Sequence, residues 1–295
     1  MELKLLSSDY FYDPVFPLKV IERNPELPYP LHSHDFYELV LIVSGKGTHF
    51  TTKGSFTILP GHVFIVAPSV QHGFRDVEDL RLYNILFDPK ILDQPLYDLL
   101  NMPGYHSLLR LEAKLEDGNC EITPLQLSPA QLAELLPLVE QMLKESDSIE
   151  YDIGAKTLAF AYFIHFMVRL FRIEDEHPRL QDRTLLRLAN VFSFLESNLD
   201  RAVSSQELME LTNMSSSTLN RHFNEATGLS PIEFHIQRRL EYASRLLRYS
   251  TLSISEIAEK TGFEDANYFS RQFKKVIGVS PSQYRNNRSL WLQTS

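Results

Sequence analysis

The feature that most constrains the fold of this chain is a segment that occurs twice near its C-terminal end. Residues 213–234 read NMSSSTLNRHFNEATGLSPIEF, and residues 262–285 read GFEDANYFSRQFKKVIGVSPSQYR. The later parts of the two copies align at an offset of 50 residues, which pairs Phe223 with Phe273, whereas the earlier parts align at an offset of 49. An insertion that leaves the apolar pattern intact on both sides lies in a turn. Each copy is therefore predicted to be two short helices joined by a turn.

Cap-forming residues lie where these helices should begin and end. In the second copy, Ser255 is expected to cap a helix that carries Ile257 and Ala258. Asp265 is expected to cap the next helix, which Gly278 ends. Two helices of about ten residues joined by a short turn form a helix-turn-helix, whose second helix can lie in the major groove of DNA. The alternative that these patterns leave open is a helical hairpin duplicated for stability.

The outward face of each second helix favours DNA recognition over that alternative. Arginine can form two hydrogen bonds with guanine, and asparagine can do the same with adenine. The predicted DNA-contacting residues are Ser216, Ser217, Asn220, Arg221 and Asn224 in the first copy and Asp265, Asn267, Ser270, Arg271, Lys274 and Lys275 in the second.

The region from about residue 184 to residue 288 resembles the DNA-binding domain of the AraC/XylS family of bacterial transcription regulators. In that family a long helix joins two helix-turn-helix units, and PIEFHIQRRLEYASRLLRYSTLSISEIA matches this linker helix. The resemblance implies a sequence-specific transcription regulator, expected to be an activator, with double-stranded DNA and RNA polymerase as partners. Two recognition helices fixed by one linker can enter successive major grooves, about 34 Å apart.

Charge divides the chain into two parts. The formal net charge of the whole chain is -9. Residues 181–295 contain 14 Lys and Arg against 12 Asp and Glu, whereas residues 1–180 contain 15 against 26. Phosphate contacts dominate the affinity for DNA. Residues 181–295 are only mildly basic, and we therefore expect them to bind DNA modestly and with marked salt dependence. A homodimer can supply the missing contacts.

The N-terminal part of the chain has the pattern of strands. The runs FYELVLIVS, GTHFTTK, HVFIVAP and LYNILF are short, apolar and β-branched, which is typical of a small antiparallel β-barrel. Apolar residues are spaced as in a helix at residues 130–143 and 153–171. The apolar stripes of these helices are candidates for a dimer face or for packing against the barrel. A charged stretch with a proline follows as a linker. The predicted domains are a cupin-like barrel at 1–125, a helical dimerisation or packing segment at 126–172, a linker at 173–182 and an all-α DNA-binding domain at 183–295.

Four residues in the predicted barrel resemble the two motifs of the cupin family, in which they surround the barrel mouth. His32, His34 and Glu38 follow the pattern H-x-H-x3-E, and His72 ends the segment APSVQH. Three imidazoles and a carboxylate suit Zn, Fe, Mn or Ni. The alternatives are a polar pocket lining, a metal site, or unrelated surface histidines. The sensor domains of the AraC family are cupin-like barrels that usually work without metal.

Two functions follow from these alternatives. Fusion to a DNA-binding domain favours sensing over catalysis, so we expect a regulator that is not an enzyme and needs no cofactor, with a divalent metal left open. The alternative is a metal-dependent cupin enzyme whose C-terminal helices serve assembly.

The sensor half has a closer resemblance. The segments LHSHDFYELVLIVSGKG, HVFIVAPSVQHGF, VEDLRLYNILF and MPGYHSLLRLE resemble, in this order, the L-rhamnose-responsive activators of the family. The resemblance implies a small sugar effector, L-rhamnose or a related deoxyhexose. Sugar hydroxyls need hydrogen-bond partners, and the ring has an apolar face. The predicted effector-binding residues are His32, His34, Glu38, His72, Arg75 and Tyr83, with Asn84 beside them and the rings of Phe36 and Phe74 as apolar neighbours; a metal ion would use the first four.

Three observations concern location. The single cysteine, Cys120, excludes an intramolecular disulfide. The first residues lack the basic start and apolar run of a secretion signal. The longest apolar segment, LAFAYFIHFMVRLF, spans 14 residues and is too short for a membrane helix. We therefore expect a cytoplasmic protein without a membrane partner.

Overall fold

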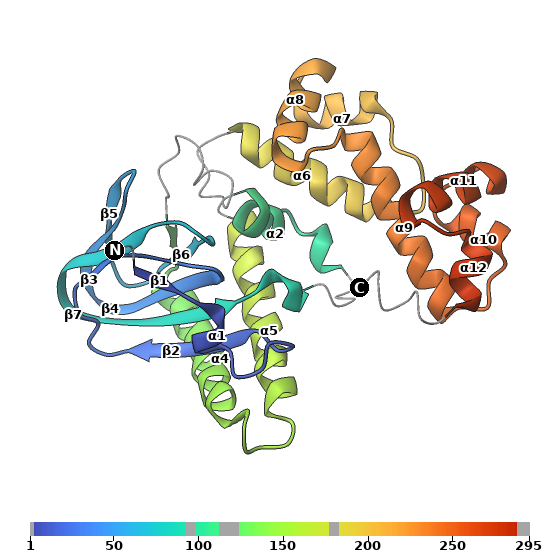
Figure 1. Ribbon diagram of the computed structural model, residues 1–295. Coiled ribbons are helices and arrows are strands. Elements are labelled where there is room, and N and C mark those ends of the chain that lie inside the picture. The colour runs from blue at the N-terminus through green and yellow to red at the C-terminus, as the bar shows by residue number, and fades with distance from the viewer. Residues whose placement is uncertain (1–2, 93–97, 112–123, 177–182, 288–295) are drawn as a thin grey trace. The chain divides into compact units, whose positions relative to one another are not determined.

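The structure is a computed structural model that describes residues 3–92, 98–111, 124–176 and 183–287. The chain divides into two compact units, residues 1–181 and 182–295, both drawn in Figure 1. Cys120 lies outside the described residues. Among the helices that the structure describes, none is both long and apolar enough to cross a membrane.

The first unit is built on one curled sheet. The strands β4 and β7 are the longest, and they pair antiparallel from Tyr37 opposite Phe87 to Thr51 opposite His72. The predicted barrel was antiparallel throughout, whereas β1 runs parallel to β3. Within the described residues the sheet contains β1 Leu3–Leu5, β2 Leu18–Arg23, β3 Tyr29–His34, β4 Tyr37–Thr51, β5 Ser55–Ile58, β6 His62–Val66, β7 His72–Phe87 and β8 Leu125–Gln126.

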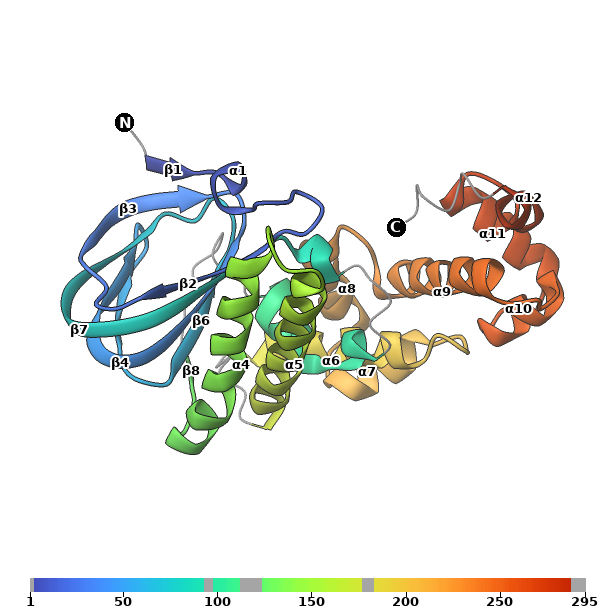
Figure 2. The same ribbon diagram turned by 90° about the horizontal axis from the view of Figure 1, so that it is seen from below.

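The two faces of this sheet have different neighbours because side chains alternate along a strand. Leu39 and Leu41 pack in one cluster with Phe163 of α5, whereas Val40 and Ile42 pack in another cluster inside the barrel. The long helices α4 and α5 lie side by side against the outer face (Figure 2). The helical elements of this unit are α1 Ser7–Tyr10, η1 Pro89–Leu92, η2 Leu99–Asn101, α2 Pro103–Tyr105, η3 His106–Leu111, α4 Pro129–Ser148 and α5 Ala155–Glu176.

The structure bears on two predictions for the helical segment, the role of its apolar stripe and the boundary of the linker. The apolar stripe of α4 packs within the unit, because Leu135 and Val139 are fully buried in the cluster shared with α5, so it is not a free dimer face. The predicted linker begins too early. Residues 173–176 belong to α5, where Ile173 and Glu174 are buried. Residues 177–182 lie outside the described part of the chain.

The second unit contains the predicted duplication. The pairs α7–α8 and α10–α11 are the two helix-turn-helix copies, and α9 joins them. Gly228 and Gly278 end the second helix of each copy in the left-handed conformation, with φ of 77° and 88°. The helices are α6 Arg183–Ser197, α7 Ser205–Thr212, α8 Ser216–Thr227, α9 Pro231–Tyr249, α10 Ile254–Lys260, α11 Ala266–Ile277 and α12 Pro281–Asn286.

One predicted cap is wrong. The N-cap of α10 is Ser253 and not Ser255, because the Ser253 hydroxyl accepts a hydrogen bond from the backbone of Glu256 and the Glu256 carboxylate accepts one from the backbone of Ser253. Ser255 lies within the first turn of the helix. Asp265 caps α11 as predicted, accepting hydrogen bonds from two backbone N–H groups.

The turn between α10 and α11 contacts both the linker helix α9 and the connection between α6 and α7. The Nε atom of Arg239 on α9 donates a hydrogen bond of 2.6 Å to the carbonyl oxygen of Thr261, and its guanidinium lies 4.0 Å from the centre of the Phe263 ring. Gly262, which follows Thr261, has a φ of 71°. A Cβ atom on Gly262 would lie 2.4 Å from the Cα atom of Arg201, in the connection between α6 and α7. The backbone of the turn after α10 therefore lies in direct contact with the backbone of the connection before α7.

Acid is expected to destabilise the second unit through His235. This buried side chain on α9 donates a hydrogen bond from Nε2 to the carbonyl oxygen of Asn198 at 3.0 Å, and burial lowers its pKa from 6.5 to about 4. Because the unfolded chain binds the proton more tightly, stability is retained above about pH 6.5 and falls by up to about 1.4 kcal/mol per pH unit between about pH 6.5 and pH 4. His235→Gln keeps a donor and removes the titrating group, so urea unfolding at a series of pH values should show a flatter decline; an unchanged decline would exclude His235 as its source.

Candidate functional site

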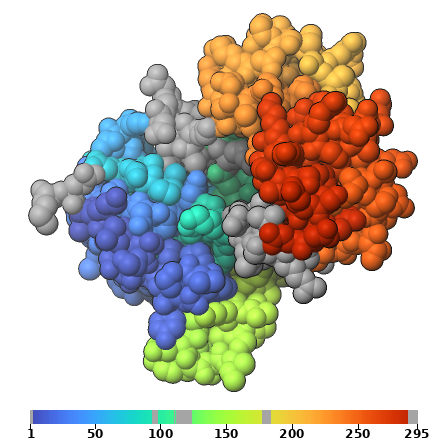
Figure 3. Space-filling model, turned by 45° about the vertical axis from the view of Figure 1, so that its right-hand side comes forward, coloured from blue at the N-terminus to red at the C-terminus, as the bar shows by residue number. Residues whose placement is uncertain are grey.

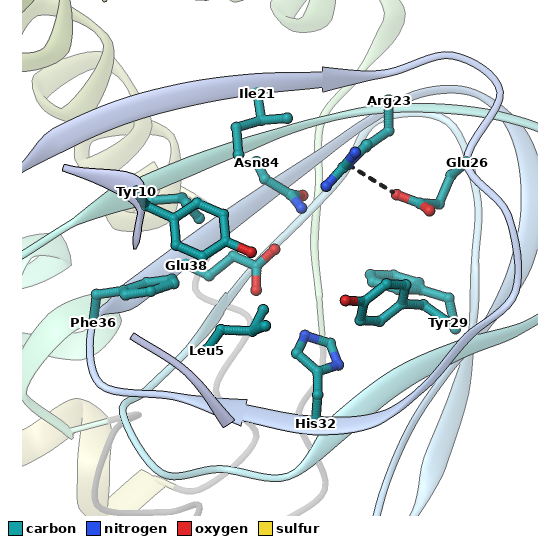
Figure 4. A pocket seen from close by; sticks show the side chains of 12 residues that line it. Leu5, Tyr10, Ile21, Arg23, Glu26, Tyr29, His32, Phe36, Glu38 and Asn84 are labelled. Carbon is teal, nitrogen blue, oxygen red and sulfur yellow. Dashed lines mark ion pairs between the residues drawn. The ribbon is translucent and has the colours of Figure 1, made fainter. Parts of the chain in front are cut away.

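A pocket opens into the barrel of the first unit, between the N-terminal segment and the strands (Figure 4). Its enclosed volume is about 40 Å³, and the space at its open mouth brings the total to about 450 Å³. Most of its lining residues come from named elements: Leu5 of β1, Tyr10 of α1, Ile21 and Arg23 of β2, Tyr29 and His32 of β3, Glu38 of β4, and Phe74, Asn84 and Leu86 of β7. Glu26 and Phe36 come from the connections before and after β3.

Polar and apolar side chains share this pocket. In Figure 4 the hydroxyl of Tyr10, the carboxylate of Glu38 and the amide of Asn84 point toward the same space. Burial raises the pKa of the Tyr10 hydroxyl and of the Glu26 carboxyl above their ordinary values. Arg23 lies at the edge, with its Nε 3.8 Å from the Glu26 carboxylate. The pocket therefore offers hydrogen-bond donors and acceptors beside apolar surface.

The four residues of the predicted histidine and glutamate cluster come together beside the pocket, which His32 and Glu38 line. The Nε2 atoms of His34 and His72 lie 3.2 Å and 3.4 Å from the same Glu38 oxygen, Oε2. His32 and His34 each donate a hydrogen bond from Nδ1 to a backbone carbonyl, that of Pro30 at 3.1 Å and that of Phe36 at 2.7 Å. Burial lowers the pKa of His32, and lowers that of His72 well below its usual value.

Four predicted effector-binding residues do not line the pocket. His34 and His72 are fully buried and contact Glu38, which does line it. Arg75 is exposed, with its Nε 3.6 Å from the Asp76 carboxylate and its guanidinium over the ring of Phe50. Tyr83 is buried on the opposite face of β7, in the cluster that packs against α4 and α5, where its hydroxyl accepts a hydrogen bond from Arg81. Because side chains alternate along the strand, its neighbour Asn84 faces the pocket instead.

Several pocket residues were missed because they come from outside the motifs. Tyr10 and Leu5 belong to the N-terminal segment, which reaches the barrel by pairing with β3, a contact between distant parts of the chain. Arg23 and Glu26 flank the end of β2. At the start of β2, buried side chains alternate with less buried ones, as they do in a strand with one face toward a core.

The predicted DNA-contacting side chains lie on α8 and on α11 with its N-cap, and Arg221 and Arg271 occupy equivalent positions. Asn220 is half-buried, and its amide donates a hydrogen bond to the Ser216 carbonyl, so it is partly engaged within α8. Asp265 is engaged in the cap of α11. Ser216 and Ser270 are half-buried; the exposed members are Ser217, Arg221 and Asn224 on α8 and Asn267, Arg271, Lys274 and Lys275 on α11.

The two exposed faces differ in charge. On α8, Glu225 takes the position that Lys275 has on α11. The Nη1 atom of Arg221 lies 3.6 Å from the Glu225 carboxylate, which partly neutralises it. On α11, Arg271 and two lysines form a cationic face, so α11 is the stronger site for a polyanion.

Comparison with known proteins agrees with both units. Residues 208–287 match a helix-turn-helix domain, and residues 19–163 match an AraC-like ligand-binding domain. The HTH-type transcriptional activator RhaR of Pectobacterium carotovorum subsp. carotovorum (strain PC1) is 30% identical over 284 residues, which cover 96% of this chain and 95% of that protein. The activator of the same name from Enterobacter sp. (strain 638) is 27% identical over 286 residues, covering 96% of each chain.

Among solved structures, the DNA-binding domain of AdpA in complex with a target DNA is 31% identical. The match covers 34% of this chain and 90% of that one, with a TM-score of 0.33.

A ligand-binding barrel followed by paired helix-turn-helix motifs defines a DNA-binding transcription regulator. The chain belongs to the AraC family of these regulators. The predicted fold class, a cupin-like barrel with trailing helices before an all-α double helix-turn-helix domain, is confirmed. The comparisons do not support the alternative of a metal-dependent cupin enzyme.

Proposed function

We propose that this protein activates transcription in the cytoplasm under the control of a small sugar, L-rhamnose or a related deoxyhexose, bound in the barrel pocket. The observation that carries the proposal is the amide oxygen of Asn84, which is buried at the pocket without a hydrogen-bond partner among the described residues. A buried acceptor without a partner costs free energy that a ligand hydroxyl can recover. The named relatives are transcriptional activators, and the sensor half resembles rhamnose-responsive members of the family.

The lining supports a polyol with one apolar face. The Glu38 carboxylate can accept hydrogen bonds from two neighbouring hydroxyls, and Asn84 and Arg23 add a buried acceptor and a donor. The rings of Phe36 and Phe74 supply an apolar wall. The sugar alters DNA binding only to the extent that it binds one arrangement of the protein better than another.

Asn84→Ala is expected to weaken sugar binding by about 1 to 3 kcal/mol, because a sugar hydroxyl loses its buried partner. Calorimetric titration of the full-length protein with L-rhamnose, and with L-mannose, which carries one more hydroxyl, measures the affinity. Arg75→Ala is the matched control, since Arg75 lies outside the pocket, and should bind like the wild type. Heat from neither sugar with the wild type would contradict the sugar assignment.

DNA is contacted, in this proposal, by the exposed faces of α8 and α11, with the Arg221 and Arg271 side chains reaching base edges and the lysines of α11 contacting phosphates. Transcription activation further implies contact with RNA polymerase. The mild positive charge of this unit favours binding as a homodimer.

The dimer contact is proposed to lie on the exposed side of α5 and the turn before it. Tyr151, Ile153 and Leu158 are exposed there, with fractional exposures of 78%, 108% and 47%, and Figure 3 shows this end of the helix pair projecting from the first unit. Leu158→Glu is expected to give monomers in analytical ultracentrifugation, since it places a charge in the contact. Leu27→Glu, a change at an exposed leucine on the barrel, should leave the dimer intact. A wild-type protein that stays monomeric at high concentration would exclude a homodimer.

A further inference from the structure

The barrel pocket has an apolar end and a polar end. In Figure 4, Tyr10 and Phe36 lie at one side of the pocket, and the ion pair of Arg23 and Glu26 lies at the other. Phe36 and Leu86 are buried, whereas Arg23 is exposed at the edge. A ligand that fills the pocket therefore meets apolar side chains at one end and charged side chains at the other.

The apolar end is one packed cluster of side chains. Its members are Leu5, Tyr10, Phe11, Ile21, Phe36 and Leu86. The Phe36 ring stacks on the His34 ring at a centroid distance of 4.6 Å and meets the Tyr10 ring edge-on at 5.4 Å, so two other rings fix its position. Tyr10 carries the only polar side-chain atom of this cluster, and its hydroxyl points toward Glu38 (Figure 4). Four members, which we call the apolar corner, line the pocket without any polar side-chain atom: Leu5, Ile21, Phe36 and Leu86.

The strand register places the apolar corner one step from the polar groups. Asn84 and Leu86 are two residues apart on β7, so their side chains point to the same face of the sheet about 7 Å apart along the strand. Ile21 lies opposite Asn84, and Glu38 lies opposite Leu86. A pyranose ring spans a comparable distance between a ring hydroxyl and the carbon attached to C5. A sugar that donates a hydroxyl to the buried amide oxygen of Asn84 therefore brings this carbon within reach of the apolar corner.

We propose that the apolar corner receives the methyl group of a 6-deoxy sugar and so distinguishes deoxyhexoses from hexoses. This step rests on the proposed function, in which the pocket holds a sugar. A methyl group in the corner buries apolar surface. A hydroxymethyl group would bury a hydroxyl beside side chains that cannot form a hydrogen bond with it, and such burial costs free energy.

Three sugars that differ only at this carbon test the assignment. L-Rhamnose carries a methyl group there, L-mannose a hydroxymethyl group and L-lyxose only a hydrogen atom. In calorimetric titrations of the full-length protein we expect L-rhamnose to bind about 10- to 100-fold more tightly than L-mannose and at least about 10-fold more tightly than L-lyxose, since one added hydroxyl or one missing carbon in an apolar pocket changes affinity by about these factors.

Two substitutions in the apolar corner test its role directly. Ile21→Thr keeps a β-branched residue in the strand, shortens the side chain and adds a hydroxyl. The preference for L-rhamnose over L-mannose should shrink by about 10-fold, because the methyl group loses contacts while the hydroxymethyl group gains a partner. Leu5→Thr should change the preference in the same direction. Leu3→Thr is the matched control, since Leu3 lies on the same strand as Leu5, is exposed and does not line the pocket.

The outcomes separate this inference from the proposed function. The preference is a ratio of two affinities measured on one preparation, so a variant that is partly unfolded still reports it, and the wild-type series needs no variant. L-Mannose or L-lyxose bound as tightly as L-rhamnose, or a preference unchanged in both Ile21→Thr and Leu5→Thr, would overturn the role of the apolar corner and leave the sugar-controlled regulator standing. Binding of none of the three sugars would defeat the proposed function and this inference with it.

Discussion

Gly262→Ala is expected to destabilise the second unit by roughly 2 to 5 kcal/mol and to abolish specific DNA binding. Two costs combine at this position. The left-handed backbone, with φ of 71°, disfavours any residue that has a Cβ atom. The new Cβ would also lie 2.4 Å from the Cα of Arg201, and backbone atoms cannot rotate aside as a side chain can. The contact between the turn after α10 and the connection before α7 would have to open.

Gly278→Ala separates these two costs. Gly278 also has a positive φ, 88°, but none of the described residues beyond its immediate neighbours lies within 4 Å of the place that a Cβ atom would take. The expected loss is therefore only about 1 to 2 kcal/mol, from the backbone alone. Urea unfolding of both full-length variants, followed by DNA binding measured by fluorescence anisotropy, gives the comparison. Equal losses in the two variants would mean that the Arg201 backbone shifts to make room and that the contact is weak.

Among changes to the DNA-contacting side chains, loss of both recognition arginines is expected to cost the most in DNA affinity. Arg221→Ala and Arg271→Ala should each weaken specific binding by about 1 to 3 kcal/mol, and because the residues lie on separate helices the double variant should lose roughly 2 to 6 kcal/mol. Arg271→Ala should be the more severe single change, since Glu225 competes with DNA for Arg221. Footprints of the single variants should lose protection at positions one helical turn apart.

Uniform weakening along the whole footprint would contradict base contact and leave phosphate contact alone. Arg75→Ala again serves as the control, because it removes the same charge from an exposed position in the first unit. Its DNA affinity should match that of the wild type.

The second unit could be predicted closely because its determinants are local. Helix periods, N-cap serines and C-terminal glycines act within one or two turns, so the duplicated pattern defined both helix-turn-helix copies. The one error concerns the N-cap of α10, which was predicted at Ser255 and lies two residues earlier, at Ser253. Several serines near the start of this helix can serve as the cap. The half-buried state of Asn220 was not visible from spacing alone.

The barrel could be predicted only in part. The motif residues His32, His34, Glu38 and His72 meet as expected. Tyr83 was placed on the wrong face of β7. Phe74, Leu82 and Asn84 all face inward, so strict alternation along the strand puts Tyr83 on the outer face, and the prediction did not follow this alternation. The N-terminal residues of the pocket depend on pairing between distant segments, which no local pattern reveals.

The backbone contact between Gly262 and Arg201 has a consequence for the promoter. Each base pair inserted between two half-sites rotates one relative to the other by about 34 to 36° about the DNA axis. The linker helix and this contact hold both copies in one arrangement. When the two half-sites are out of phase with that arrangement, the DNA between them has to twist or bend. Bases between the half-sites then influence affinity through the energy needed to twist or bend them, even where no side chain touches them.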